Sequence, residues 1–393
     1  MNLRVKLLAD YYLGGVAHIL LKPFVMLLGR ILRRDHSLDP TRLKELTIIK
    51  MLGGGSLIIA YPSLLALKKK YPNLTLGLVT TPAIKPFADL TGLFDNIILI
   101  RDDGIFHLVW DTAKAIRLLW CTSDLLDLEI HSRFSSIFTL LTCAYNRIGI
   151  YTDLSFGRRS LYTHLLFYNK YSPVHLLYDQ VVRLLGVTDI DFTASKTEFQ
   201  SRIDLQFPDD RIQRGGIEIG VAPGCSDYGK ERMLTVDHWC RILADRHSAT
   251  EMPNINFIGS HSDYEFSEQI IERLKPLLRQ ATFSNCCGKY PLIQSVALMR
   301  NFKVLYCIDS SLIHFARLVN VRTVSFWGPT DPRTRLRIDP GLREETYYAA
   351  LSCSPCIHIT LETPCYGNNV CMNASLDPKS YAGDKNPIWL ARD

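Results

Sequence analysis

The sequence lacks the motifs that mark two common classes of nucleotide-dependent enzyme. No G-x-G-x-x-G fingerprint follows its first predicted strand, and the second predicted strand, residues 74–81, ends in threonines without the acidic residue that a dinucleotide ribose needs. No Gly-Lys-Ser/Thr sequence completes a Walker loop. These absences argue against a dinucleotide-dependent oxidoreductase and a P-loop nucleotide hydrolase.

The sequence also has little excess charge of either sign. Its 393 residues carry a formal net charge of +6, and 21% of them are charged. No long basic stripe with interleaved aromatic residues is present, so we expect no nucleic-acid partner. A phosphorylated small molecule or an anionic lipid surface fits this composition better.

Near the amino terminus the apolar stretches are interrupted. Residues 11–34, YYLGGVAHILLKPFVMLLGRILRR, are broken by Lys22 and Pro23, so each apolar piece is shorter than the ~20 residues that a span requires. The pattern predicts a pair of interfacial helices whose basic residues face anionic head groups. These residues are Lys22, Arg30, Arg33 and Arg34. A helical extension packed on the folded body and a true span remain as alternatives.

No export signal with a small-residue cleavage site follows this stretch. We therefore expect a cytoplasmic chain whose eleven cysteines are mostly reduced.

The remaining sequence predicts two α/β halves. The chain exceeds the ~250–300 residues at which single cores stop growing. Apolar strand patterns alternate with helical ones from residue 46 and again from residue 217, and a helix with Pro62 in its first turn is predicted over residues 61–71. Residues 192–216 are polar and poor in strands, which predicts the linker. Such sheets bind ligands at the carboxyl ends of their strands, so we expect a ligand in a cleft between the halves.

A glycine turn follows the first predicted strand. Gly53, Gly54 and Gly55 precede a helix whose amino terminus carries partial positive charge. Without Cβ atoms they allow a ligand to approach the backbone closely, so the turn is a candidate site. A tight turn that binds no ligand is the alternative.

The second half carries two loops suited to an anion. Ser226, Lys230 and Arg232 follow the strand pattern of residues 217–223 and offer donors to phosphate oxygens. A second group lies where a later strand ends and a helix begins, and it presents hydroxyls, backbone N–H groups and an imidazole. Its members are Asp309, Ser310, Ser311 and His314.

Five segments together resemble glycosyltransferase family 9, the heptosyltransferase-like enzymes. They are IIKMLGGGSLIIAYPSLLALKKKYP, DLEIHSRFSS, GCSDYGKERMLTVDHW, CIDSSLIHFARLVNVRTVSFWGPTDP, and CSPC followed by CYGNNVCM. The resemblance implies a GT-B fold of the α/β class, with two Rossmann-like domains facing a central cleft. We expect a membrane-associating segment at residues 1–45, an acceptor domain at 46–205, a nucleotide-sugar domain at 206–345 and a cysteine-containing tail at 346–393.

By this resemblance the chain is an inverting glycosyltransferase that moves a sugar, heptose being one candidate, from a nucleotide-diphosphate sugar. The implied acceptor is the lipopolysaccharide core or another lipid-linked glycan, and the implied location is the cytoplasmic face of the inner membrane. The family needs no bound metal for transfer, and Lys230 and residues 309–314 would line the donor diphosphate pocket. Ser311 stands where a glycine is common. A nucleotide-sugar epimerase and a non-catalytic nucleotide- or glycan-binding protein are the alternatives.

The general base of the reaction is not evident. Ser56 stands where the family usually has an aspartate, and an unassisted serine cannot accept the proton that inverting transfer removes. Glu129, at the predicted carboxyl end of the fourth strand, is one substitute, and Glu129→Gln would then abolish transfer while sparing nucleotide affinity. His131, a substrate phosphate and other carboxylates such as Asp102 or Asp103 are the alternatives. Glu129 also has a structural alternative, a surface pair with Arg133.

Four late cysteines have a spacing that can hold a structural zinc ion. They follow a C-x2-C-x8-C-x5-C pattern at Cys353, Cys356, Cys365 and Cys371. The spacing is less regular than in common zinc ribbons, so disulfides or packed thiols remain alternatives.

Overall fold

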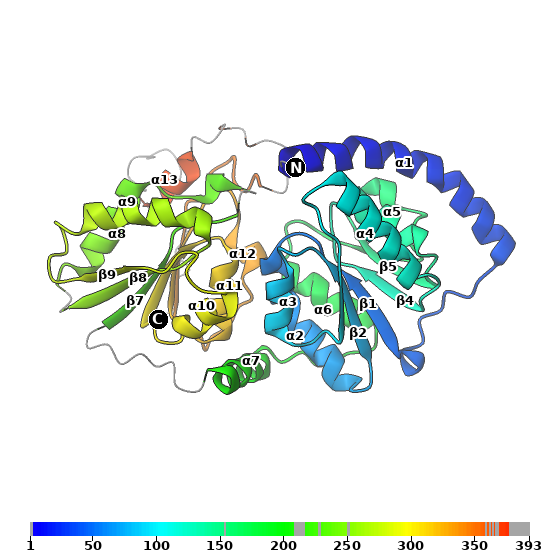
Figure 1. The fold of residues 1–393 in the computed structure, drawn as a ribbon, viewed down its shortest axis with the longest axis horizontal. Helices are drawn as coiled ribbons and strands as arrows, with labels where there is room; N and C mark the ends of the chain where they lie inside the picture. The colour runs from blue at the N-terminus through cyan, green and yellow to red at the C-terminus, as the bar shows by residue number, and fades with distance from the viewer. Residues whose placement is uncertain are drawn as a thin grey trace. The chain divides into compact units, whose positions relative to one another are not determined.

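The computed structural model divides the chain into two compact units, Met1–Asp191 and Phe192–Asp393. It describes residues 3–152, 155–207, 217–226, 229–249, 252–357, 360, 363, 365 and 369–376. Each unit is a parallel sheet flanked by helices (Figure 1).

The N-terminal unit contains a six-stranded parallel sheet in the order β3-β2-β1-β4-β5-β6. Its strands are β1 (Glu45–Ile49), β2 (Thr75–Thr80), β3 (Asn96–Leu99), β4 (Asp124–Asp127), β5 (Asn146–Tyr151) and β6 (His164–Phe167). Its helices are α1 (Leu3–Leu32), η1 (Pro40–Arg42), α2 (Gly54–Lys70), α3 (Lys85–Thr91), α4 (Ile105–Leu118), α5 (Arg133–Leu141), η2 (Phe156–Arg158) and α6 (Val174–Leu184). The central strands are buried, as expected for a parallel sheet covered by helices.

The C-terminal unit repeats this architecture in the order β12-β11-β10-β7-β8-β9. Its strands are β7 (Ile217–Ala222), β8 (Pro253–Phe257), β9 (Thr282–Asn285), β10 (Val304–Ile308), β11 (Thr323–Trp327) and β12 (Glu344–Tyr348). Its helices are α7 (Phe192–Gln206), η3 (Lys230–Arg232), α8 (Val236–His247), η4 (His261–Asp263), α9 (Tyr264–Leu274), α10 (Leu292–Met299), α11 (Ser311–Leu318), α12 (Pro332–Arg335) and α13 (Val370–Leu376). The predicted α/β class with two Rossmann-like units is confirmed.

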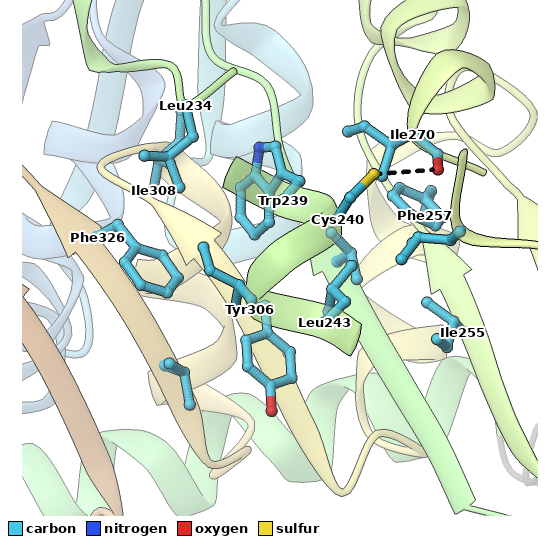
Figure 2. Packing of buried hydrophobic residues seen from close by; sticks show 14 of the residues in the cluster. Leu234, Trp239, Cys240, Leu243, Ile255, Phe257, Ile270, Tyr306, Ile308 and Phe326 are labelled. Carbon is cyan, nitrogen blue, oxygen red and sulfur yellow. Dashed lines mark hydrogen bonds between the residues drawn. The ribbon is translucent and has the colours of Figure 1, made fainter. Parts of the chain in front are cut away.

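Buried aromatic and aliphatic side chains fill the core of the C-terminal unit (Figure 2). Trp239 of α8 is fully buried and meets Phe326 of β11 edge-on, with ring centroids 5.8 Å apart. Cys371 and Met372 of α13 belong to the same core. The segment predicted as a separate tail from residue 346 therefore contributes both β12 and α13 to this unit, because its apolar residues complete the core. Residues 377–393 lie outside the described residues.

The unit boundary lies at the start of the predicted linker rather than within it. Residues 192–206 form α7, which packs on the C-terminal unit through Phe199, fully buried beside Phe315. Lys196 forms an ion pair with Asp339 in the same unit. The polar composition that suggested a linker is the outer face of a surface helix. Residues 208–216 lie outside the described residues.

Two predicted helices differ from those observed. Residues 3–32 form the single helix α1 instead of a pair, and the exposed Pro23 lies inside it. One helical segment, Leu8–Leu32, is long and apolar enough to cross a membrane by length and composition. Helix α2 begins at Gly54, so Pro62 is an internal residue rather than a first-turn one.

Candidate functional site

Most of the predicted site residues lie at the switch points of the two parallel sheets, where the chain stops adding strands on one side and begins to add them on the other. In the N-terminal unit β1 and β4 are neighbours, and Ile49 pairs with Asp127. The glycine turn follows β1, and the loop with Glu129 and His131 follows β4. Doubly wound sheets bind ligands at this point. The two loops predicted from the sequence therefore follow neighbouring strands at their carboxyl ends.

The equivalent point of the C-terminal unit lies between β7 and β10, where Ala222 pairs with Cys307. The loop with Ser226, Lys230 and Arg232 follows β7, and the Asp309 turn follows β10. Both anion-binding loops predicted from the sequence thus leave adjacent strands at their carboxyl ends.

Backbone conformation and packing require glycine at two positions of the turn, Gly53 and Gly54. Gly53 adopts φ +74°, a left-handed conformation that favours glycine. A Cβ on Gly54 would lie 2.6 Å from three ring carbons of Phe87 on α3. Ser56 is half-buried in the first turn of α2, and its N–H donates to the Gly53 carbonyl. Close packing of α2 against α3 therefore requires a glycine at position 54, with or without a ligand.

Gly54→Ala is therefore expected to lower the free energy of unfolding by about 1–3 kcal/mol, the usual range for overpacking. Urea-induced unfolding followed by circular dichroism measures the change. Gly29→Ala is the matched control, because a Cβ there meets nothing within 4 Å and the substitution should be neutral or slightly stabilising. Equal stability of the two variants would contradict the packing role of Gly54.

Glu129 is buried and binds the segment that enters the glycine turn. Its Oε1 accepts hydrogen bonds from Lys50 Nζ at 3.1 Å, Met51 N at 2.7 Å and Leu52 N at 2.8 Å. Both side chains of the Lys50–Glu129 ion pair are 7% exposed. The alternative of a surface pair between Glu129 and Arg133 does not hold, because Glu129 is buried against Lys50 and Arg133 packs against α1. Glu129 fixes the backbone between β1 and the turn.

A second buried network fixes the loop that carries Glu129. Glu129 N donates to Asp127 Oδ1 at 2.9 Å. Arg158, which is 1% exposed, lies 3.3 Å from Asp127 Oδ2 and donates to the carbonyl of Ser132 at 2.6 Å. Tyr162 also donates to Asp127. The end of β4 and the start of α5 are therefore held by one carboxylate and one guanidinium.

The other candidates for the base lie in different places. His131 is exposed on the same loop as Glu129. Asp102 and Asp103 follow β3 at the edge of the sheet, and Asp103 pairs with His107. The structure thus brings His131 to the switch point and leaves Asp102 and Asp103 away from it.

In the C-terminal unit Asp309 joins the two candidate loops. It is 6% exposed, and its Oδ2 accepts a hydrogen bond from Thr330 Oγ1 at 2.7 Å and lies 3.4 Å from Arg232 Nη1. Burial alone would raise the pKa of Asp309, but Arg232, Arg335 and the Thr330 hydroxyl outweigh it and hold the pKa below its usual range. Asp309 is therefore an anion that orients Arg232. Lys230 and Ser226 are exposed on the same loop.

The amino terminus of α11 presents donors beside Asp309. Ser310 is the N-cap residue, but its side chain does not cap the helix, and its buried Oγ has no partner among the described residues. Ser311 is half-buried in the first turn. Burial lowers the pKa of His314 to about 3, so its ring is neutral at physiological pH. An uncapped helix terminus with an unsatisfied hydroxyl suits an anionic ligand.

The late cysteines lie in one neighbourhood without forming a metal site. Burial and the nearby thiols of Cys356, Cys353 and Cys365 raise the pKa of Cys371 to about 12. In the part of the chain that the structure describes, which includes all four, no group of three or more His, Cys, Asp or Glu residues is placed to hold a metal ion. The zinc site stays a prediction, which metal analysis of the purified protein would test.

Sequence reasoning missed the residues that support the site. Lys50, Asp127 and Arg158 are buried charges that fix loops, and Thr330 tethers Asp309. A signal existed for two of them, because Lys50 and Asp127 interrupt otherwise apolar strand patterns. Arg158 had none.

Comparison with known proteins assigns the chain to a family. The model of "Glycosyltransferase family 9 (heptosyltransferase)" matches residues 132–366. Lipooligosaccharide heptosyltransferase 2 of Haemophilus influenzae is 29% identical over 115 residues, which are 29% of this chain and 32% of that protein. Lipopolysaccharide heptosyltransferase 2 of Escherichia coli K12 is 28% identical over 114 residues, with the same coverage. The matched segment thus spans about a third of the length of these relatives.

Solved structures show the same fold over more of the chain. A family 9 glycosyltransferase from Veillonella parvula has a TM-score of 0.58 at 18% identity, covering 79% of this chain and 86% of its own. The E. coli ADP-heptose heptosyltransferase II has a TM-score of 0.57 at 16% identity, covering 86% and 99%. An E. coli heptosyltransferase solved with ADP has a TM-score of 0.57 at 15% identity, covering 77% and 93%. These likenesses support the GT-B class for the two units. The match of the family model to more than half of the sequence shows that the chain belongs to glycosyltransferase family 9, the heptosyltransferase family.

Proposed function

We propose that the chain is an inverting glycosyltransferase that moves a sugar, with heptose as the first candidate, from a nucleotide-diphosphate donor. The proposed acceptor is the lipopolysaccharide core or another lipid-linked glycan at the cytoplasmic face of the inner membrane. The family membership and the names of the heptosyltransferase relatives support this choice.

The observation that carries the proposal is the anion cradle between β7 and β10. Arg232, Lys230 and the uncapped amino terminus of α11 offer positive charge and N–H donors to a diphosphate. Asp309 holds Arg232 in place from a buried position. Because negative charge develops on the diphosphate as the glycosidic bond breaks, these donors stabilise the leaving group and take the role that a metal ion has in other transferases.

The N-terminal unit receives the acceptor in this proposal. The acceptor oxygen attacks the anomeric carbon, the bond from that carbon to the diphosphate oxygen breaks, and the hydroxyl proton passes to a base. The geometry favours a positioning role for Glu129 over the base role predicted from sequence, because Lys50 and two backbone N–H groups already bind its Oε1. We assign the role of general base, which accepts this proton, to His131, an exposed residue on the same loop.

A thermal-shift panel of nucleoside diphosphates tests the donor site. ADP at a hundredfold excess over its dissociation constant should stabilise the protein by about 2.7 kcal/mol, because the ligand binds only the native state. We expect ADP to act more strongly than other nucleoside diphosphates, since a heptosyltransferase of the same fold was solved with it.

Adenosine is the matched control, because it lacks the diphosphate that the cradle recognises. Equal shifts with adenosine and ADP, or no shift with any nucleoside diphosphate, would refute the donor site. A shift with ADP-heptose but no product with any glycan acceptor would instead favour the binding-only alternative, which the serine at position 56 suggests.

A further inference from the structure

Helix α1 packs on the N-terminal unit with its polar and small residues and exposes its apolar ones. Asp10, Gly14, His18 and Lys22 are spaced by four residues along one side, and Gly14 and His18 are buried. The opposite side carries Leu13, Ile19 and Leu20, which are 71%, 73% and 69% exposed. A surface helix of a soluble protein has the reverse pattern. The outer face of α1 therefore needs a partner other than water.

The inner face of α1 contacts α5 through specific hydrogen bonds and close packing. Asp10 accepts hydrogen bonds from the backbone N–H groups of Arg133, at 2.9 Å, and Phe134 in the first turn of α5. The guanidinium of Arg133 lies over the ring of Tyr11, 4.3 Å from its centroid. A Cβ on Gly14 would lie 2.6 Å from Cβ of Arg133, so the glycine is what lets the helices approach. A carboxylate at a helix amino terminus is favourable, which fixes α1 at this point.

His18 forms a second point of attachment. It is 3% exposed, and a Cβ on Gly157 would lie 2.9 Å from its Nδ1. Burial lowers the pKa of His18 to about 4, so the ring enters this contact without charge. The two attachments hold the first half of α1 against the folded unit.

This attachment decides between spanning a membrane and lying on it. The part of the helix beyond the attachments at Asp10 and His18 runs from Ile19 to Leu32, about 21 Å at 1.5 Å per residue. The hydrocarbon core of a bilayer is about 30 Å thick. The full segment would reach across only if the joint with α5 came apart.

The basic residues at the end of α1 indicate the kind of lipid. Arg30 lies in the last turn of α1, Arg33 and Arg34 follow the helix directly, and Arg34 also donates to the carbonyl of Cys143. Basic residues beside an exposed apolar face are typical of helices that bind anionic interfaces.

Helix α4, which also contacts α5, carries a second exposed apolar face. Both α1 and α4 contact α5 (Figure 1). Phe106 and Trp110 of α4 stack with centroids 6.3 Å apart and are 73% and 62% exposed, and Ile105 and Val109 beside them are 73% and 63% exposed. Tryptophan at an exposed apolar face is typical of the membrane interface.

We propose that α1 lies in the plane of an anionic membrane, with its outer face in lipid and its inner face locked to the N-terminal unit, and that α4 makes a second contact. The inference rests on the proposed function only for the identity of that membrane. It makes α1 an interfacial element of the enzyme rather than a tether that crosses the bilayer.

Sedimentation of the full chain with vesicles tests this. The protein should bind vesicles of phosphatidylethanolamine and phosphatidylglycerol more tightly than phosphatidylcholine vesicles, and high salt should weaken the binding. The variant Leu13→Gln/Ile19→Gln/Leu20→Gln should bind at least tenfold more weakly with an unchanged Tm, because these side chains touch no core. The matched control, Leu205→Gln/Leu277→Gln/Ile338→Gln, changes equally exposed apolar residues of the C-terminal unit and should bind like the wild type.

A second readout addresses α4. Vesicles of brominated lipid should quench Trp110 fluorescence, and Trp110→Leu should remove most of that quenching. A wild-type chain that stays in the supernatant would overturn the proposal, as would membrane binding that survives alkaline carbonate, which indicates a span. So would a soluble dimer that the α1 variant dissociates, because a second copy would then cover the face. Vesicle binding needs neither donor nor acceptor, so its failure is distinct from a failure of the nucleotide test.

Discussion

Replacing Asp309 with alanine is expected to abolish nucleotide binding and to lower the free energy of unfolding of the C-terminal unit by about 3–5 kcal/mol. The loss of stability has two physical causes. Arg232, whose side chain is 12% exposed, would be left largely buried without its carboxylate, and Thr330 would lose its hydrogen-bond acceptor. Isothermal titration with ADP measures the loss of nucleotide binding, and urea-induced unfolding measures the loss of stability.

Two further variants separate the charge of Asp309 from its hydrogen bond. Asp309→Asn keeps an acceptor for Thr330 but removes the charge that holds Arg232, so its affinity should fall between those of the wild type and the alanine variant. Arg333→Gln is the control, because it breaks the nearby pair with Asp331 at a side chain that is 54% exposed and should cost less than about 1 kcal/mol. If the Asp309→Ala variant bound ADP as tightly as the wild type, the proposal that the loops after β7 and β10 bind the donor diphosphate would be wrong.

Most of the central strands could be predicted because burial on two faces makes them continuous apolar runs. The patterns over residues 46–52 and 304–309 correspond to β1 and β10. Of the four edge strands, β3 was predicted and β6, β9 and β12 were missed; the internal strand β5 was missed as well. An edge strand buries less surface, so β9 reads TFSN and β12 reads EETYY, without an apolar pattern. The continuity of α1 was also missed, because a proline inside a helical pattern usually ends or kinks the helix, whereas Pro23 lies within α1.

The candidate site was predictable where it depends on local order in the chain. A loop that follows a strand at its carboxyl end can be located from the strand itself. In this way the sequence placed Gly53, Glu129, Lys230 and Asp309 in the loops after β1, β4, β7 and β10, where the structure has them. The bond between Lys50 and Glu129 joins residues 79 positions apart, and periodicity carries no information about such a pair. A charge inside an apolar run shows only that a partner is needed, not which residue supplies it.

The second large expected effect concerns the buried ion pair between Lys50 and Glu129. Glu129→Gln should lower turnover about a hundredfold while leaving ADP affinity unchanged, because the proposed nucleotide site lies in the other unit. The amide still accepts hydrogen bonds from Met51 and Leu52, but Lys50 loses its counter-charge in a site where the pair is 7% exposed. Removing one partner of a buried pair costs about 3–5 kcal/mol. The glycine turn then shifts, and a displacement of about 1 Å can by itself cost a hundredfold in rate.

The double variant Lys50→Met/Glu129→Gln distinguishes a positioning residue from a base. If Glu129 positions the turn, removing the unpaired ammonium should restore both stability and turnover to within about tenfold of the wild type, since well-packed apolar replacements of buried pairs are often neutral. If Glu129 is the base that takes the proton from the hydroxyl of the acceptor sugar, the double variant should regain stability while its turnover stays low, because no carboxylate is left at that position. Single-turnover rates and urea midpoints of the four chains in this cycle give the answer, with Lys50→Met as the matched single variant. We expect both properties to recover, which would leave the proton to His131 on the adjoining loop; recovery of stability alone would make Glu129 the base.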